Sequence, residues 1–351
     1  MNTIHDIPNE LLDRIAGYLD AQSFRVFRRS CRHLANGALH RFISHYLRER
    51  TVDASSFRSL QLISGLANHA KLKNHVHTLV IISKLYDVHL ADTYLSVAEA
   101  AKDTMSGEPY STAVKARSLE LARGYRALYD EATSVHNRSE TISTLALAMQ
   151  SFPNLRIIKY QTETPRCDEL DRFYLIRQWF YDGDVLDGKQ AFCNFTEALV
   201  RVRPSTELVI EVPVETDVTK AFKQLRRAAK NIYRLSLIEP TTTRPWTNNV
   251  SSRVRKLLHS TDALRCLNIT LSSHTRRQNV INLIAQKTFS HLHSLSFTGP
   301  FTVAQLLRFL KEHQDTLHQL SLKGAILSRD LANDPSGYIG VLQAIRDLLY
   351  R

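Results

Sequence analysis

A six-residue frame with apolar residues at its first, fourth and sixth positions recurs along this chain. Its copies begin at Val76, Leu155, Ile232, Leu264, Leu292 and Leu317. The last four copies start roughly thirty residues apart, and a segment that can form a helix precedes each of them. Because one strand and one helix cannot bury their apolar faces alone, such units stack into a continuous core. The spacing therefore predicts an α/β fold built as an irregular strand-and-helix solenoid.

Helices and strands can be assigned around these copies. The expected helices cover residues 55–69, 90–102, 113–133, 220–229, 252–258, 277–287, 303–313 and 337–350. The expected strands cover residues 76–82 and 208–212 in addition to the later copies of the frame. The polar stretches 161–190 and 240–250 indicate surface loops, and residues 106–109 indicate a loop within a helical insertion.

The first fifty residues lack the frame and predict a small module of three helices. Pro8 suits the first turn of a helix, and apolar residues follow at helical spacing at Leu11, Leu12, Ile15 and Leu19. A second helix is expected from Ser23, with an apolar side formed by Phe24, Phe27, Cys31 and Leu34, and a third over residues 39–47. Because three short helices bury little surface, this module is expected to complete its core with a partner.

The N-terminal sequence resembles a known family. The run IPNELLDRIAGYL, residues 7–19, resembles the start of an F-box, and RSCRHL, residues 29–34, resembles its second helix, where a Cys-Arg pair is frequent. The later pattern resembles fungal F-box proteins whose C-terminal half is a degenerate leucine-rich-repeat array. The asparagine that usually follows each strand in such repeats is missing here, so the array is expected to be irregular.

The resemblance implies three regions and a function. Residues 1–50 would be the F-box, 51–138 a helical linker region with the first strand and a helical insertion, and 139–351 the repeat array. The chain would be the substrate-recognition subunit of an SCF-type E3 ubiquitin ligase, binding a Skp-type adaptor and through it a cullin. The implied adaptor-binding residues are Ile7, Pro8, Leu11, Leu12, Ile15, Leu19, Phe24, Phe27, Cys31 and Leu34. Catalysis would be done by other subunits, without a cofactor in this chain.

Target binding is expected on the repeat array, away from the buried leucines. The strand face of a solenoid is a common binding surface, so polar residues at outward-facing strand positions are the candidates. These candidates are Arg234, Arg265, Asn268, His293, His318 and Gln319.

The chain carries a formal net charge of +12, which admits acidic partners. Four cations at helical spacing, Lys223, Arg226, Arg227 and Lys230, form either a solvated helix face or a patch for an acidic partner. Aromatic residues do not interleave with these cations as base stacking requires, which disfavours nucleic acid. Two alternatives nevertheless stay open: an F-box scaffold outside a ligase, and a basic repeat protein that binds nucleic acid.

Other function classes lack their sequence signals. The chain has no secretory signal and no apolar run of membrane-spanning length, so a cytoplasmic or nuclear location is expected. Its four cysteines lie far apart, which favours free thiols. No grouping has zinc-like spacing, and no glycine-rich phosphate loop or nucleophile elbow occurs. An enzyme or a metalloprotein is therefore not expected.

Overall fold

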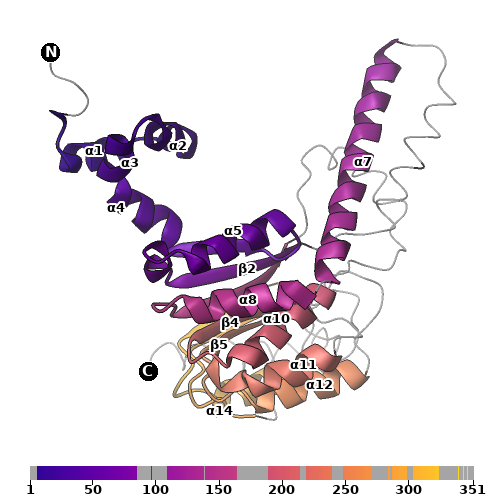
Figure 1. Cartoon of the computed structure of the whole chain (residues 1–351). Helices are drawn as coiled ribbons and strands as arrows, with labels where there is room; N and C mark the ends of the chain where they lie inside the picture. Colours follow the sequence, from indigo (N-terminus) through magenta and orange to yellow (C-terminus); the bar gives the residue numbers. More distant parts are fainter. Residues whose placement is uncertain are drawn as a thin grey trace.

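The protein has a mixed α/β fold around one eight-stranded parallel sheet (Figure 1). The computed structural model describes residues 6–84, 96, 109–137, 139–163, 189–213, 219–238, 248–270, 284, 287–298, 303–323, 339, 343 and 346. Each strand pairs with its neighbours in the sequence, in the order β1 to β8. A parallel connection needs a crossover segment, so this order places a connecting segment between every two adjacent strands.

The strands follow the recurring frame. They are β1 (Glu49–Asp53), β2 (Thr78–Lys84), β3 (Ile157–Glu163), β4 (Glu207–Pro213), β5 (Ile232–Ile238), β6 (Cys266–Thr270), β7 (Ser294–Thr298) and β8 (Gln319–Lys323). The register aligns the apolar positions of adjacent copies, for example Leu235 with Leu267 and Leu267 with Leu295. Apolar side chains from successive strands therefore form continuous layers in one core.

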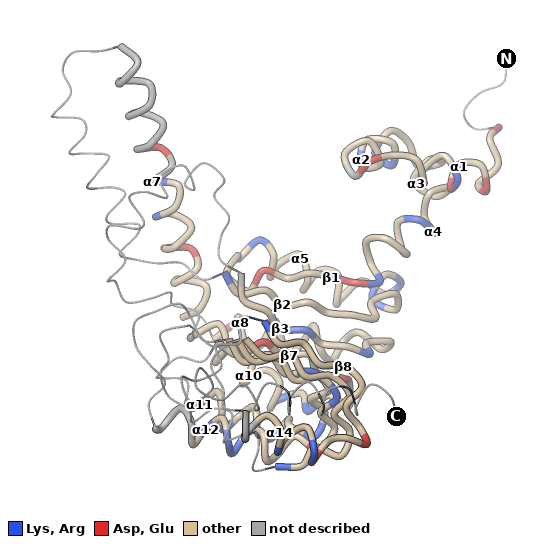
Figure 2. Tube along the Cα trace, turned by 180° about the vertical axis from the view of Figure 1, so that it is seen from behind, with Lys and Arg blue, Asp and Glu red and all other residues tan. Residues whose placement is uncertain are grey.

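Helices line one face of the sheet (Figure 1). They are α5 (Phe57–Asn68), α8 (Ser139–Ser151), α10 (Lys189–Val202), α11 (Thr219–Arg227), α12 (Asn248–His259) and α14 (Val303–Glu312). Two short 3-10 turns, η3 (Leu72–His75) and η5 (Ala229–Asn231), lead into β2 and β5. Viewed from behind, the strands lie in front of these helices (Figure 2). We call β1–β8 and these helices the sheet region.

Most expected elements are confirmed, and three were missed. The predicted helices 55–69, 220–229, 252–258 and 303–313 correspond to α5, α11, α12 and α14. The missed elements are β1, α8 and α10. β1 contains one fully buried apolar residue, Val52, which is too weak a signal for a strand. Because β1 is present, the predicted first strand at 76–82 is the second strand of the sheet.

The insertion after β2 is only partly described. The helix expected over 113–133 is longer, because α7 spans Pro109–His136 and begins within the loop expected at 106–109. In Figure 1, α7 projects away from the sheet region. The expected helices 90–102, 277–287 and 337–350 and the loop 240–250 lie mainly outside the described residues. The predicted loop 161–190 overlaps the end of β3 and the start of α10.

The first fifty residues form a separate small group of helices. They are α1 (Asn9–Ala16), α2 (Ala21–Ser30), α3 (Arg32–Gly37) and α4 (Leu39–Phe42), followed by the π-helical turn η2 (Ile43–Leu47). Figure 1 shows α1–α3 set apart from the sheet region and joined to it through α4. Their small core, built on Ala16, Phe24 and Ala38, is distinct from the core of the sheet region. We call residues 6–47 the N-terminal module.

The second predicted helix is wrong in its extent. It begins at Ala21, because the Asp20 carboxylate accepts hydrogen bonds from the backbone N–H groups of Gln22 and Ser23, both at 2.8 Å. It ends before Cys31, whose backbone is extended with φ −160° and ψ 165°. The Ser30 hydroxyl donates to the Val26 carbonyl at 2.9 Å, a local bond that competes with helix continuation. Leu34 therefore lies on α3.

Candidate partner-binding surfaces

The N-terminal module exposes large apolar side chains from three of its helices. Leu11 and Ile15 lie four residues apart on α1, and their exposed fractions are 48% and 43%. Tyr18 follows α1 with 85% exposed, and Val26 on α2 is 62% exposed. Leu39, at the start of α4, is also exposed. Exposed apolar side chains gathered in one small module are typical of a surface that a partner covers.

The predicted adaptor-binding residues divide into buried and accessible groups. Leu12, Phe24 and Leu34 are almost fully buried within the chain. Pro8, Leu11 and Ile15 are exposed. The remaining four, Ile7, Leu19, Phe27 and Cys31, are half-buried. The buried residues hold the module together, so only the accessible residues offer side-chain area to a partner.

The accessible side of α1 is held in place by contacts on its other side. Gly37 on α3 faces Leu12 so closely that a Cβ atom there would lie 2.5 Å from Leu12 Cδ1. The Asp13 carboxylate accepts a hydrogen bond from the backbone N–H of Arg41 at 3.0 Å. These contacts fix α1 against α3 and α4, and they leave Leu11 and Ile15 facing outwards.

Aromatic and cationic packing joins α2 and α4 to η2 within the module. Phe24 and Phe42 both stack on Tyr46, with ring centroids 5.4 Å and 5.7 Å from the Tyr46 ring. The Arg28 guanidinium lies 3.7 Å from the centroid of the Phe42 ring, and its partial burial there lowers its pKa. The guanidinium stays charged, because its ordinary pKa is so high. These contacts pack α2 and α4 against the turn that leads into β1.

Tyr18, Val26 and Leu39 were not predicted as candidate residues. Tyr18 continues the helical spacing of Leu11 and Ile15, so its signal was present in the sequence. Val26 stands among the arginines of α2, outside the apolar side predicted for this helix, and it is exposed. A single apolar residue among arginines gave no signal of a binding surface in the sequence.

The predicted target-binding residues fall into two groups, one on the strands and one just before them. Arg234, Asn268 and Gln319 lie on strands, at positions that alternate with the buried leucines and face away from the helices. Arg265, His293 and His318 were expected on the same outward strand face, and this is wrong. Each of them precedes the first residue of its strand, since β6, β7 and β8 begin at Cys266, Ser294 and Gln319.

The second group is linked laterally by backbone hydrogen bonds. The N–H of Arg265 donates to the Tyr233 carbonyl at 2.8 Å, and the N–H of His293 donates to the Arg265 carbonyl at 2.8 Å. The N–H of His318 donates in turn to the His293 carbonyl at 2.9 Å. We call Tyr233, Arg265, His293 and His318 the amino-end row. It brings together three predicted residues and Tyr233, which was missed.

The predicted basic cluster lies on and just beyond α11. Lys223, Arg226, Arg227 and Lys230 are all exposed. The neighbouring Lys220 donates to Glu197 at 2.8 Å, and hydrogen bonding from Lys220 lowers the pKa of the Glu197 carboxyl. Glu197 also accepts from Arg201 at 3.0 Å. A helix face of this kind attracts acidic groups by its charge, without a defined binding geometry.

Three further features of the described part of the chain concern possible metal ligands, cysteine thiols and membrane-spanning helices. Within it, no cluster of three or more His, Cys, Asp and Glu residues has the geometry to hold a metal ion. Cys31 and Cys266 are free and half-buried, Cys193 is half-buried, and Cys167 lies outside the described residues. Among the described helices, none combines the length and the apolar character required to span a bilayer.

Comparison with known proteins adds no family assignment. The chain matches no protein-family model, and the search of curated proteins finds no similar sequence.

Proposed function

We propose that this chain is a substrate receptor of an SCF-type ubiquitin ligase. The N-terminal module would act as an F-box that binds a Skp-type adaptor and through it a cullin. The sheet region would act as an irregular leucine-rich-repeat-like array that holds the target. The mechanism is proximity, because a target held beside a ubiquitin-charged enzyme is present at high effective concentration. On this proposal the chain contributes binding energy and no catalytic group.

One observation carries the proposal: Leu11, Ile15, Tyr18 and Val26 are exposed on a module that also resembles the F-box in sequence. Fully burying one leucine or isoleucine side chain contributes about 1.5–3 kcal/mol. Several such side chains in one small module are enough to drive association. The F-box resemblance says which partner would cover them, since this segment in the family binds a Skp-type adaptor.

The test is co-purification of the full chain with a Skp-type adaptor. The informative variant is Leu11→Ala with Ile15→Ala, since both side chains are exposed and neither supports the core of the chain. We expect this variant to weaken adaptor binding by at least about tenfold, which corresponds to about 1.4 kcal/mol. Leu62→Ala is the matched control, because Leu62 is equally apolar and 60% exposed but lies on α5 of the sheet region.

The outcomes separate the parts of the proposal. Unchanged melting of both variants must accompany the binding data, so that unfolding is not mistaken for a lost contact. If the intact chain does not bind the adaptor, the F-box assignment is wrong. If the adaptor binds but no cullin is retained with it, the chain is an adaptor-bound scaffold and not a ligase receptor.

A further inference from the structure

The connections that lead into the strands carry an unusual charge distribution. We consider the connection into each of the strands β2–β8, starting at residues 69, 152, 203, 228, 260, 287 and 313. These connections contain seven lysines and arginines: Lys71, Lys73, Arg156, Arg203, Lys230, Arg265 and Lys287. Their acidic residues are Asp262 and Asp315. Asp262 and Lys287 pair with each other, since Lys287 Nζ lies 3.2 Å from the Asp262 carboxylate, which leaves six cations and one acidic residue. This edge of the sheet is therefore electropositive.

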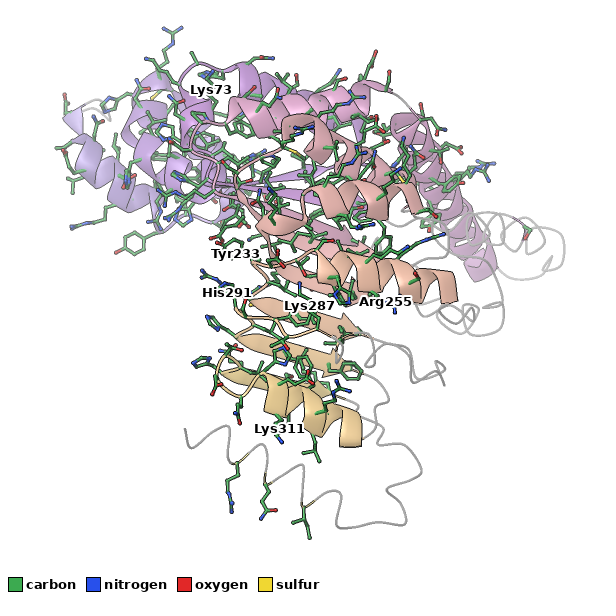
Figure 3. All side chains as sticks on the ribbon, turned by 90° about the horizontal axis from the view of Figure 1, so that it is seen from below. Lys73, Tyr233, Arg255, Lys287, His291 and Lys311 are labelled. Atoms are coloured by element: carbon green, nitrogen blue, oxygen red, sulfur yellow. The ribbon has the colours of Figure 1, made fainter. Side chains whose placement is uncertain are left out.

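Parallel pairing brings these cations into line. All strands run in the same direction, so every amino end lies at the same edge, and adjacent strands are about 4.8 Å apart. Figure 3 shows Tyr233 and His291 at this edge, whereas Arg255 and Lys311 lie on the helices. Glu49 at the start of β1 and Glu207 at the start of β4 are acidic positions on this edge, and the residues at β5–β8 lie beyond Glu207.

The side chains of the amino-end row contact one another in two pairs, Tyr233 with Arg265 and His293 with His318. The Arg265 guanidinium lies 4.8 Å from the centroid of the Tyr233 ring. The rings of His293 and His318 meet edge to face at 5.3 Å. Nδ1 of His293 and Nδ1 of His318 both approach the Thr316 carbonyl, at 3.1 Å and 2.6 Å. A carbonyl accepts a hydrogen bond, so each Nδ1 carries the proton and Nε2 is the atom that each ring can offer to a partner.

Arg234 and Gln319 extend this surface onto the adjacent outward strand positions. Both side chains are exposed, and both lie in the register row that runs from Arg234 through Cys266 and Ser294 to Gln319. Arg234 on β5 and Arg265 just before β6 thus present two guanidinium groups from neighbouring parts of the sheet. A guanidinium group pairs with a carboxylate through two parallel hydrogen bonds, which gives such a site both affinity and orientation.

We propose that the edge formed by the amino-end row and Arg234 binds an acidic, Asp- and Glu-rich segment of a protein partner. This inference rests on the receptor role proposed above and specifies the chemistry of its target. The segment would run across β5–β8, with its carboxylates on Arg234 and Arg265 and its backbone N–H groups donating to Nε2 of the two histidines. The paired strands of the sheet region hold these side chains at a fixed spacing, which the exposed side chains of α11 do not have.

The ring contacts favour a peptide over a nucleic acid. Binding of single-stranded nucleic acid uses aromatic faces on which bases stack. One face of the Tyr233 ring is covered by Arg265, and the His293 and His318 rings pack against each other. The amino-end row therefore offers a partner mainly cationic and hydrogen-bonding groups, and few open aromatic faces on which bases could stack.

The experiment measures fluorescence anisotropy of a labelled peptide of alternating Asp and Glu, titrated with the full chain. Arg234→Gln with Arg265→Gln removes two charges from the proposed edge. Lys223→Gln with Arg226→Gln removes two charges from α11 and is the matched control, since these side chains are also exposed. We expect the edge variant to weaken binding by at least about tenfold. The control should change it by less than about twofold, because only long-range attraction is lost.

Three results would overturn the inference. The first is no binding of the peptide by the intact chain. The second is equal weakening by the two variants, which would show attraction by net charge alone. The third is tighter binding of a single-stranded oligouridylate with the same loss in the edge variant, which would assign the edge to nucleic acid. Adaptor co-purification by the edge variant is measured in parallel, so failure of the peptide site is distinguished from failure of the receptor role.

Discussion

In the sheet region the apolar positions of the recurring frame are buried, apart from the partly buried Leu320 and Leu322 of the last copy, whereas in the N-terminal module several of the largest apolar side chains are exposed. Leu235, Leu237 and Ile269 are completely inaccessible, but Tyr18 and Val26 are mostly open to solvent. The cause is the number of neighbours. An inner strand of the sheet has a strand on each side and a helix above it, while α1 packs mainly on two short helices, α3 and α4. A region with few internal neighbours has surface left for a partner.

The largest effect is expected from a substitution in the core of the sheet region. Phe195 on α10 is fully buried, and its ring stacks on Tyr160 of β3 at 4.5 Å. Phe195→Ala removes this contact and leaves a cavity, so it should lower the free energy of unfolding by about 3–5 kcal/mol. Urea denaturation measures this, with the surface substitution Leu147→Ala on α8 as the control. A loss below about 1 kcal/mol would mean that the sheet region repacks as easily as a loosely built module.

A second substitution sharpens the comparison within the module, where neighbouring leucines should differ. Leu12 is buried against Gly37, and Leu12→Ala should cost about 2–5 kcal/mol of the module's stability. Leu11 is exposed, and Leu11→Ala should change stability by less than about 0.5 kcal/mol. Hydrogen exchange of α1–α3 amides, compared with amides of β5–β7, reports each region separately. Equal costs at the two positions would contradict the assignment of Leu11 to a partner-binding surface.

The smallest effect should appear as a pH dependence of the sheet region. His313 is buried, its Nε2 accepts the backbone N–H of Phe289 at 2.9 Å, and its Nδ1 donates to the Phe309 carbonyl at 2.9 Å. Burial lowers the pKa of His313 below its ordinary value of about 6.5. At pH values between the folded-state and unfolded-state pKa of this histidine, the unfolded chain therefore binds a proton at His313 and the folded chain does not. Stability contributed here is complete above about pH 6.5 and falls as the pH is lowered from there towards the folded-state pKa.

Substituting this histidine tests the sign of that dependence. His313→Gln removes the titrating group but keeps an acceptor for the Phe289 N–H, so the loss of stability between neutral and mildly acidic pH should become smaller. His318→Gln, at an exposed histidine of the same connection, is the control and should leave the dependence as it is. Denaturation curves at a series of pH values measure both. A steeper acid loss in the His313 variant would refute the proposed neutral ring.

The sequence predicted the periodic part of the fold well. Residues such as Leu235, Leu267 and Leu295 recur at strand spacing and between helical segments, and a pattern of this kind depends only on which side chains must be buried. β1 was missed because its sequence, ERTVD, is mostly polar and its pairing comes entirely from β2. α10 was missed even though Phe192, Phe195 and Leu199 have helical spacing, because the long polar stretch before it indicated a loop.

The candidate surfaces depended more on the tertiary structure. The chain by itself determined which residues are apolar, where they recur, and that the N-terminal module is too small to bury its own apolar residues. Only the fold decided that Leu12 is buried while Leu11 is exposed, and that Arg265, His293 and His318 meet Tyr233 at one edge. The physical reason is that periodicity is a local property, readable along the chain. The contacts of the amino-end row join residues about 25–30 positions apart, and these meet only when parallel strands align their amino ends.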